Sequence, residues 1–141
     1  MQAVMLIAGA SDLLPTFRQA LRQAYPTALI SDMANQPDFA IEFSTRSRVC
    51  VEYYGPDLES IGWGKDEMSI ITAHFSQRPN VYSLAYRGID AVKQVVVILA
   101  NSDQVMIDND CGDLMIGSTF IARILKEPDW NWLQDFHDSE V

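Results

Sequence analysis

Cysteine is scarce in this sequence: only Cys50 and Cys111 occur among 141 residues, and they lie far apart along the chain. Two cysteines do not form the disulfide framework of a small secreted domain, so we expect two reduced, partly buried thiols. Long hydrophobic runs are also missing, because no apolar stretch reaches the roughly 18 residues that a membrane helix needs. Residues 1–12 lack the basic segment that opens a signal peptide. We therefore expect a cytoplasmic protein with no membrane partner.

Sequence motifs of the common enzyme classes are absent as well. The dinucleotide-binding motif G-x-G-x-x-G needs three glycines, and only Gly9 follows the first apolar run. The G-x-S-x-G motif of hydrolases does not occur, and His74 and His137 have no zinc-ligand spacing to each other or to a cysteine. A catalytic site assembled from distant polar residues stays open. We identify no catalytic residue, no metal-ligand set and no cofactor, and we favour a protein that is not an enzyme.

Positive charge is scarce too, most of all near the C-terminus of a chain whose net charge is −9. Residues 1–101 contain ten acidic and eight basic residues, a net charge of −2, whereas residues 102–141 contain nine acidic and two basic residues, a net charge of −7. This distribution argues against nucleic-acid binding, which needs a basic surface. It permits attraction of a basic partner protein, or it serves solubility alone.

What the sequence does contain is a globular composition, 48% hydrophobic and 21% charged, in a length that suits one domain. Apolar runs and alternating patterns predict strands at 3–8, 27–31, 39–54, 68–77, 80–88 and 104–108, with a tight turn near 45–48 that divides the third segment into two strands. Apolar residues three and four apart predict helices at 12–25, within 89–103 and within 117–128. Residues 68–77 also fit a helix, although we favour a strand. We predict a single α+β domain over residues 1–141, with a mostly antiparallel sheet and about three helices packed on it.

Local signals indicate how these helices begin and which side they bury. Ser11 or Asp12 is expected to cap the first helix, and Ser118 the last. The last helix is expected to bury one apolar face, made of Phe120, Ile121, Ile124 and Leu125. Residues 80–108 are predicted to form a strand–helix–strand unit. Residues 129–141 form an acidic, aromatic tail that we expect to dock in part on the body.

The densest group of polar residues lies at 108–113, directly after an apolar run, and comprises Asp108, Asn109, Asp110 and Asp113. A calcium loop of the EF-hand type is excluded, because a loop that starts at Asp108 has Asp113 where glycine is required and Thr119 where glutamate is required. The pair Asp108 and Asp110 has the D-x-D spacing of some divalent-metal sites. A strand-ending turn with Gly112 at a positive φ angle is a second interpretation. An acidic surface for a partner is a third, and it is compatible with the turn.

Aromatic residues accompany two of the acidic segments. Tyr54 and Trp63 flank a glycine-rich acidic loop, and Trp130 and Trp132 flank the acidic tail together with Asp129. Protein interfaces favour tryptophan and tyrosine anchors surrounded by charge. The alternative is that most of these rings are core packing.

The sequence as a whole resembles the immunity proteins of bacterial toxin–immunity pairs, which are small, acidic, single-domain proteins. The residues that carry the resemblance are Asp108, Asp110, Asp113, Asp129, Trp130, Trp132, Asp135 and Asp138. The resemblance implies tight binding to a cognate basic toxin, often a nuclease, whose active site the acidic side chains block by mimicking phosphates. It implies no catalytic residues.

Three hypotheses follow. The first is a protein-binding module, immunity- or inhibitor-like, that blocks a basic partner through an acidic–aromatic surface made of Asp108, Asp110, Asp113, Trp130, Trp132, Asp129, Tyr54 and Trp63. The second is a small enzyme or ligand-binding domain with a carboxylate metal site at Asp108 and Asp110. The third is a homo-oligomeric adaptor, such as a homodimer, that pairs through its aromatic surfaces. We favour the first.

Overall fold

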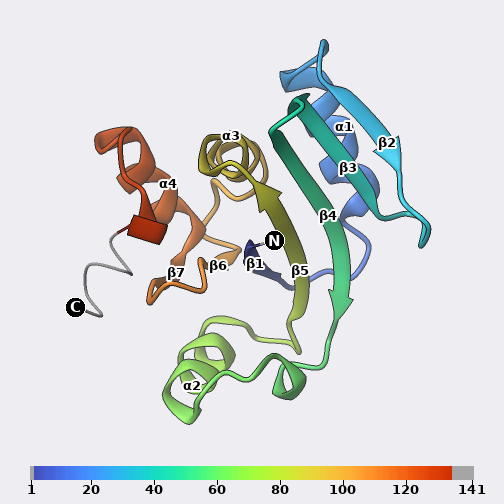
Figure 1. Ribbon diagram of the computed structural model, residues 1–141. Coiled ribbons are helices and arrows are strands. Elements are labelled where there is room, and N and C mark those ends of the chain that lie inside the picture. Colours follow the sequence, from blue (N-terminus) through green and yellow to red (C-terminus); the bar gives the residue numbers. More distant parts are fainter. Residues whose placement is uncertain (1, 135–141) are drawn as a thin grey trace.

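The computed structural model describes residues 2–134, which form one seven-stranded antiparallel sheet with helices on both of its faces (Figure 1). The strands are β1 (Gln2–Ala8), β2 (Leu29–Asp32), β3 (Phe39–Ser44), β4 (Ser47–Gly55), β5 (Asn80–Arg87), β6 (Met106–Asp108) and β7 (Leu114–Ile116). The helices are α1 (Leu14–Ala24), the 3₁₀ helix η1 (Glu59–Ile61), α2 (Lys65–His74), α3 (Ile89–Leu99) and α4 (Gly117–Lys126). The predicted α+β class is confirmed, with more helices than expected.

The strand order β2-β3-β4-β5-β1-β6-β7 places the first strand near the middle of the sheet. Both β5 and β6 pair antiparallel with β1, so they run parallel to each other with β1 between them. Helix α3 makes the connection from β5 to β6. The expected strand–helix–strand unit therefore exists, and β1 is inserted between its two strands.

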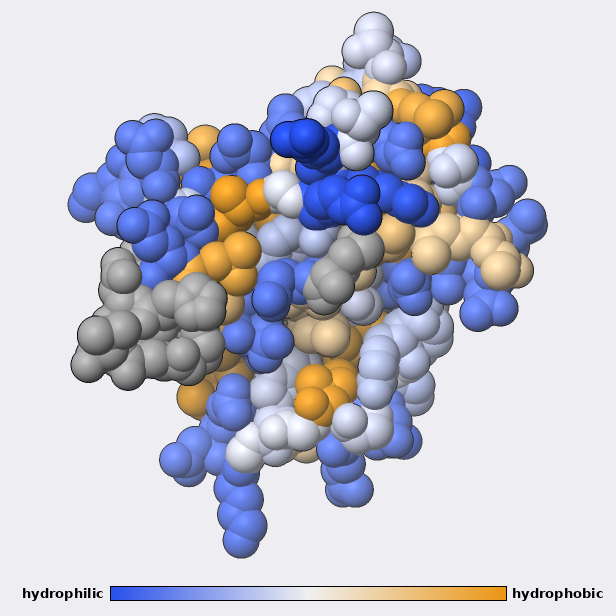
Figure 2. Space-filling view, in the orientation of Figure 1, coloured by the Kyte–Doolittle hydropathy of each residue, from blue (hydrophilic) through white to orange (hydrophobic). Residues whose placement is uncertain are grey.

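The main hydrophobic core lies between the sheet and α1, α3 and α4. Val4 and Leu6 of β1, Val92 and Val96 of α3, and Phe120 of α4 are fully buried there. Burial of this kind contributes about 25 cal/mol per Å² of apolar surface. Figure 2 shows that most of the visible surface is hydrophilic, with small separate hydrophobic groups. No helix among residues 2–134 is long and apolar enough to cross a membrane.

Helix α2 occupies the other face of the sheet and covers a smaller cluster that includes Ile7 of β1, Val81 of β5 and Met106 of β6. Its position contradicts the strand that we expected at residues 68–77. The alternating pattern of that segment also satisfies a helical period, and Ile71 is the buried residue of the helix. The acidic first turn, in which the Glu67 carboxylate accepts a hydrogen bond from the Gly64 N–H at 3.1 Å, is the signal that favours a helix.

The expected helix caps and one core residue also need correction. Helix α1 is capped at Leu13 and receives no side-chain cap from Ser11 or Asp12. Helix α4 begins at Gly117, so Ser118 lies inside it, and its hydroxyl donates to the carboxylate of Asp103 instead. The first amides of α4 are satisfied by backbone carbonyls, at 2.9 Å from Gly117 N to Val105 O and 3.1 Å from Ser118 N to Ser102 O. Tertiary contacts thus replace the local caps.

Leu125 is 67% exposed, although we expected it on the core face of α4. The three other members of that predicted stripe, Phe120, Ile121 and Ile124, are buried. After α4 the chain is held by Lys93 of α3, whose buried ammonium donates to the carbonyl of Pro128 at 3.0 Å. This contact directs residues 128–134 back onto the core.

Candidate functional site

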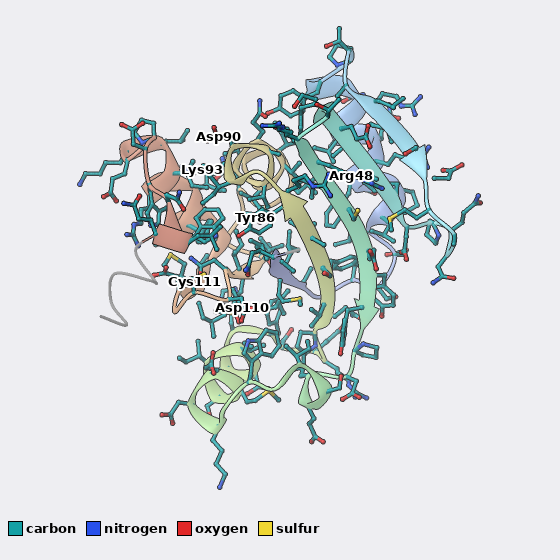
Figure 3. All side chains as sticks on the ribbon, in the orientation of Figure 1. Arg48, Tyr86, Asp90, Lys93, Asp110 and Cys111 are labelled. Carbon is teal, nitrogen blue, oxygen red and sulfur yellow. The ribbon has the colours of Figure 1, made fainter. Side chains whose placement is uncertain are left out.

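The polar group at 108–113 forms the turn of a β-hairpin between β6 and β7. Strand β7 was not predicted from the sequence. Asp110 has a φ angle of 59° and Gly112 one of 97°, so the predicted turn with a positive φ angle at Gly112 is confirmed. In the view of Figure 3, Asp110 and Cys111 lie between α4 above and α2 below. The turn is therefore positioned at the junction of the two helical layers.

Asn109 organises this turn from the inside. The residue is 1% exposed, and its side-chain oxygen accepts hydrogen bonds from the backbone N–H groups of Cys111 at 2.9 Å and Asp113 at 3.2 Å. Its side-chain NH₂ group donates to the Asp113 carboxylate at 2.9 Å. Asparagine and aspartate stabilise turns by such contacts with nearby backbone. Asn109 thus fixes the direction in which the neighbouring carboxylates point.

Asp108 lies at the end of β6 and meets Trp63, which is 45 positions away in the sequence. The indole Nε1–H of Trp63 donates to Oδ2 of Asp108, and the backbone N–H of Asp110 donates to Oδ1 at 2.8 Å. A hollow of about 400 Å³ opens beside this pair. Its lining residues are Met5, Ile61, Gly62, Trp63, Glu67, Asp108, Asp110, Gly112 and Leu114. The glycine-rich loop and the 108–113 turn therefore form one acidic and aromatic site.

The electrostatics of this hollow are one-sided. Asp108 is only 8% exposed, and desolvation by burial raises the pKa of its carboxyl group above the ordinary value, against the opposing effects of the Trp63 and Asp110 hydrogen bonds. The charges of Asp110 and Glu67 raise the pKa further. Among residues 2–134, no lysine, arginine or histidine forms an ion pair with Asp108, Asp110 or Glu67. The site holds uncompensated negative charge.

Asp113 points to the other side of the turn and has a cationic partner. The Arg123 guanidinium lies 3.5 Å from its carboxylate and 3.1 Å from that of Glu127. The same guanidinium stacks 3.7 Å from the ring centre of Trp130, an attractive cation–π geometry. Asp113 is therefore part of a structural network around Arg123, and it contributes less free charge than Asp108 or Asp110.

The two tail tryptophans are core residues in this structure. Trp130 is 6% exposed and Trp132 is 1% exposed, and both rings pack against Phe120 with centroid distances of 5.2 and 5.5 Å. The Trp132 indole N–H donates to the hydroxyl of Tyr86 at 3.0 Å. The expected docking of the tail is present as far as residue 134. We expected both rings to lie on a partner-binding surface. That expectation needs correction, because both side chains are buried.

The remaining predicted site residues are spread over the surface. Tyr54 is 46% exposed at the end of β4, and its hydroxyl lies 3.0 Å from that of Ser60 in η1, outside the lining of the hollow beside Trp63. Asp129 is exposed beyond α4 and does not line the hollow beside Asp108. Asp135 and Asp138 lie outside the described residues. The structure thus brings together Asp108, Asp110 and Trp63, adds Glu67, and leaves Asp129 apart.

The carboxylates of Asp108 and Asp110 do not form a prepared metal site. Each oxygen of Asp108 already accepts one hydrogen bond, from Trp63 or from the backbone of Asp110, so part of its acceptor capacity is used. Among residues 2–134, no group of three or more histidine, cysteine, aspartate or glutamate side chains is arranged to hold a metal ion. A divalent ion bound by protein side chains alone prefers more oxygen ligands than this pair supplies.

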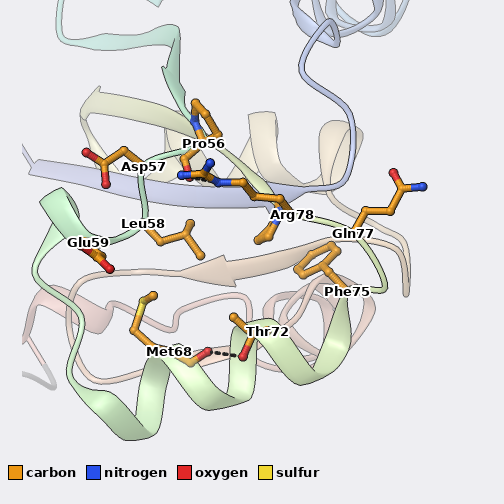
Figure 4. A pocket seen from close by; sticks show the side chains of 10 residues that line it. Pro56, Asp57, Leu58, Glu59, Met68, Thr72, Phe75, Gln77 and Arg78 are labelled. Carbon is orange, nitrogen blue, oxygen red and sulfur yellow. Dashed lines mark hydrogen bonds between the residues drawn. The ribbon is translucent and has the colours of Figure 1, made fainter.

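A second hollow, of about 490 Å³, also adjoins α2 (Figure 4). Its walls are apolar side chains of Leu58, Met68 and Phe75. Its rim is charged: Asp57 and Glu59 come from the segment around η1, and Arg78, whose Nε–H donates to the Pro56 carbonyl at 3.2 Å, comes from the loop before β5. No motif in the sequence indicated this hollow, because its residues come from the loop before η1, from α2 and from the loop after α2. Its acids extend the acidic surface around η1 and α2.

No protein-family model matches the chain, and no significant match to a curated protein or to a solved structure was found.

Proposed function

We propose that this protein is a protein-binding module of the immunity or inhibitor type, and that it blocks a basic partner through the acidic surface around Trp63 and Asp108. The observation that supports the proposal is the uncompensated charge of Asp108, Asp110 and Glu67 around one hollow with an indole in its wall. Like charges held close together repel each other and destabilise the compact state. A basic partner relieves that repulsion on binding.

The partner that fits best is a protein with lysine or arginine residues grouped on one surface, as in a nuclease that binds phosphates. Carboxylates held in fixed positions can occupy the places of phosphate groups in such a site, and the Trp63 ring offers a face for a cation. The exposed ring of Tyr54 and the acids Asp57 and Glu59 widen the surface around η1. A toxin that acts inside the cell would meet this protein in the cytoplasm, which is the location that we propose.

The test begins by capturing partners on the immobilised protein at low salt and eluting them with rising salt. The dissociation constant of the captured basic protein is then measured by calorimetry for wild type, for Asp110→Asn and for Glu67→Gln. We expect each substitution to weaken binding by about three- to tenfold and to reduce the salt dependence, because each removes one charge from the contact. Asp90→Asn is the matched control, since Asp90 is an exposed acid on α3, which covers the other face of the sheet.

Equal loss of affinity for Asp90→Asn would mean that net charge alone attracts the partner, and unchanged affinity for all three variants would contradict the proposed surface. The metal-site hypothesis has a separate test in the melting temperature. A rise with Mg²⁺, Mn²⁺ or Ca²⁺ that Asp108→Asn and Asp110→Asn abolish would favour it over protein binding.

A further inference from the structure

Strand β7 is the last strand of the sheet, and its outer edge has unpaired backbone groups. Gly117 N–H donates to Val105 O at 2.9 Å and Asn109 N–H donates to Asp113 O at 3.1 Å, so the pairs 105/117 and 109/113 are hydrogen-bonded pairs of the β6–β7 ladder. Hydrogen-bonded and non-bonded pairs alternate along an antiparallel ladder. Leu114 and Ile116 therefore belong to the non-bonded pairs.

The consequence is that the N–H and C=O of Leu114 and the N–H of Ile116 point away from β6. No other strand among residues 2–134 pairs with this edge. An unpaired edge is a template for another extended chain unless charge, proline, a bulge or a covering element blocks it. Residues 114–116 are all apolar, with no charge and no proline between them.

An apolar groove runs beside the same edge. A hollow of about 540 Å³ lies between α2 and β7, and its lining residues are Ile70, Ala73, His74, Met106, Leu114, Met115, Ile116 and Thr119. Ile70 of α2 is 51% exposed, a high fraction for a large apolar side chain that points toward other apolar residues. Side chains of a strand added to β7 would alternate between this groove and the opposite face.

One end of the groove is acidic. The hollow beside Asp108 shares Leu114 with the apolar groove, and its carboxylates are those of Asp108, Asp110 and Glu67. The open edge of β7, the apolar groove and the carboxylates are therefore neighbours on one continuous surface. This combination fits an extended segment whose groove-facing side chains are apolar beside Ile70 and basic at the end beside Leu114.

We propose that β7 binds an extended segment of the basic partner as an eighth strand of the sheet. Main-chain hydrogen bonds form with Leu114 and Ile116, apolar side chains enter the groove beside Ile70, and a lysine or arginine side chain reaches the carboxylates around Trp63. The inference rests on the proposed function and names how that partner docks. A second copy of this chain fits less well, because its β7 and the residues on either side of it, 109–122, contain no lysine or arginine to meet those carboxylates.

The test uses a proline at Ile116. This residue has a φ angle of −60° at the N-cap of α4, which suits proline, and the N–H that proline removes faces the open edge and not β6. Met115 before it is extended, as proline requires of its predecessor. Ile116→Ala is the matched control, because it loses the same side chain and keeps the N–H. Far-UV circular dichroism and the urea midpoint verify that both variants fold.

The probe is the synthetic heptapeptide Lys-Ser-Val-Ser-Val-Ser-Lys, whose lysine and valine side chains share one face of an extended chain. It is titrated into ¹⁵N-labelled protein, with Glu-Ser-Val-Ser-Val-Ser-Glu as its charge control. We expect shifts of the Leu114 and Ile116 amide signals with a dissociation constant below about 1 mM. We expect the acidic peptide to leave those signals unchanged. Binding to Ile116→Pro should be at least about tenfold weaker than to Ile116→Ala, because one main-chain hydrogen bond is lost and its acceptor in the peptide stays unpaired.

Several results would overturn the inference. Absence of peptide binding at millimolar concentration, equal binding by both Ile116 variants, or amide shifts confined to another edge of the sheet would each do so. A dimer in sedimentation that Ile116→Pro dissociates would assign the edge to a second copy instead. If the basic partner captured from cells binds Ile116→Pro and Ile116→Ala equally but loses affinity for Asp110→Asn, the proposed function stands and strand addition is wrong.

Discussion

The indole N–H of Trp63 is hydrogen-bonded to the carboxylate of Asp108, which joins the loop before α2 to the end of β6. At the opposite end of the helix, the His74 ring nitrogen lies 2.7 Å from the carbonyl oxygen of Asp103, in the loop before β6. Helix α2 is thus attached at both ends to the segment around one short strand. Between these attachments, Ile71 is its buried residue. The polar contacts therefore carry much of the positioning of α2, and with it the shape of the candidate site.

Replacing Trp63 with phenylalanine should destabilise the protein by about 1–2 kcal/mol. The change removes a donor from a buried carboxylate, and hydrogen bonds to charged groups contribute more than neutral ones. Urea unfolding followed by far-UV circular dichroism measures the effect. Trp63→Phe in the Asp108→Asn background should cost less, because the charge that the indole satisfies is gone. Equal costs in the two backgrounds would show that only ring size matters at this position.

The stability of the wild type relative to Asp108→Asn should fall as pH rises. Burial raises the pKa of Asp108 above its ordinary value of 3.8, so the folded state holds this proton more tightly than the unfolded state. Raising the pH through the interval from 3.8 up to the folded pKa therefore removes a proton that favours folding. The difference in unfolding free energy between the two proteins is measured from pH 3.5 to about 7. The contributions of the other carboxylates to the pH dependence cancel in this difference. A difference that does not change with pH would contradict the raised pKa.

Asn109→Ala should destabilise the hairpin by about 2–3 kcal/mol, because it removes three side-chain hydrogen bonds and leaves two backbone N–H groups without acceptors. Asp110→Asn in the same turn is the control. Asp110 is exposed, and asparagine tolerates its positive φ angle, so we expect a change within about 0.5 kcal/mol. Thermal and urea unfolding of both variants provide the comparison. Similar losses for the two would mean that charge, and not the buried amide, holds the turn.

Gly117→Ala should cost about 1–3 kcal/mol or more, as overpacking does in a tight core. A Cβ atom at this position would overlap the carbonyl oxygen of Ala100 and lie 2.6 Å from Cγ2 of Val105. The start of α4 therefore approaches the loop after α3 closely enough to require glycine. Gly9→Ala is the control, since no heavy atom lies within 4 Å of the Cβ position there. A Gly117→Ala protein as stable as the Gly9→Ala protein would show that the loop moves freely.

Local patterns in the sequence predicted most of the elements correctly. The alternation at 39–54 fits the strand period, the short apolar run at 3–8 is followed by turn residues, and the stripe around Val92 and Val96 has helical spacing in spite of its β-branched residues. The prediction failed at residues 68–77, where both periods fit. It also missed β7, because three residues are too few to show a period and pairing with β6 alone makes them a strand.

The candidate site was predicted in part. The density of acids at 108–113 marked the turn, and Gly112 indicated its backbone geometry. The meeting of Trp63 with Asp108 was beyond sequence reasoning, since no local signal relates residues 45 positions apart. Core packing of Trp130 and Trp132 was one of two interpretations of the sequence, although both were assigned to the partner-binding surface. Their place beside acids suggested a surface, whereas Lys93 and the rings around Phe120 draw them into the core.

The sequence by itself determined the α+β class, the acidic charge and its concentration near the C-terminus, because composition and short-range periodicity depend only on neighbouring residues. Tertiary structure decided which of the acids keep their charge uncompensated. Asp113 meets Arg123 and is neutralised, whereas Asp108 meets an indole that satisfies its hydrogen bonding and leaves its charge. Contact between distant segments sets that difference, since the electrostatic energy of a carboxylate depends on the few groups within several ångströms of it.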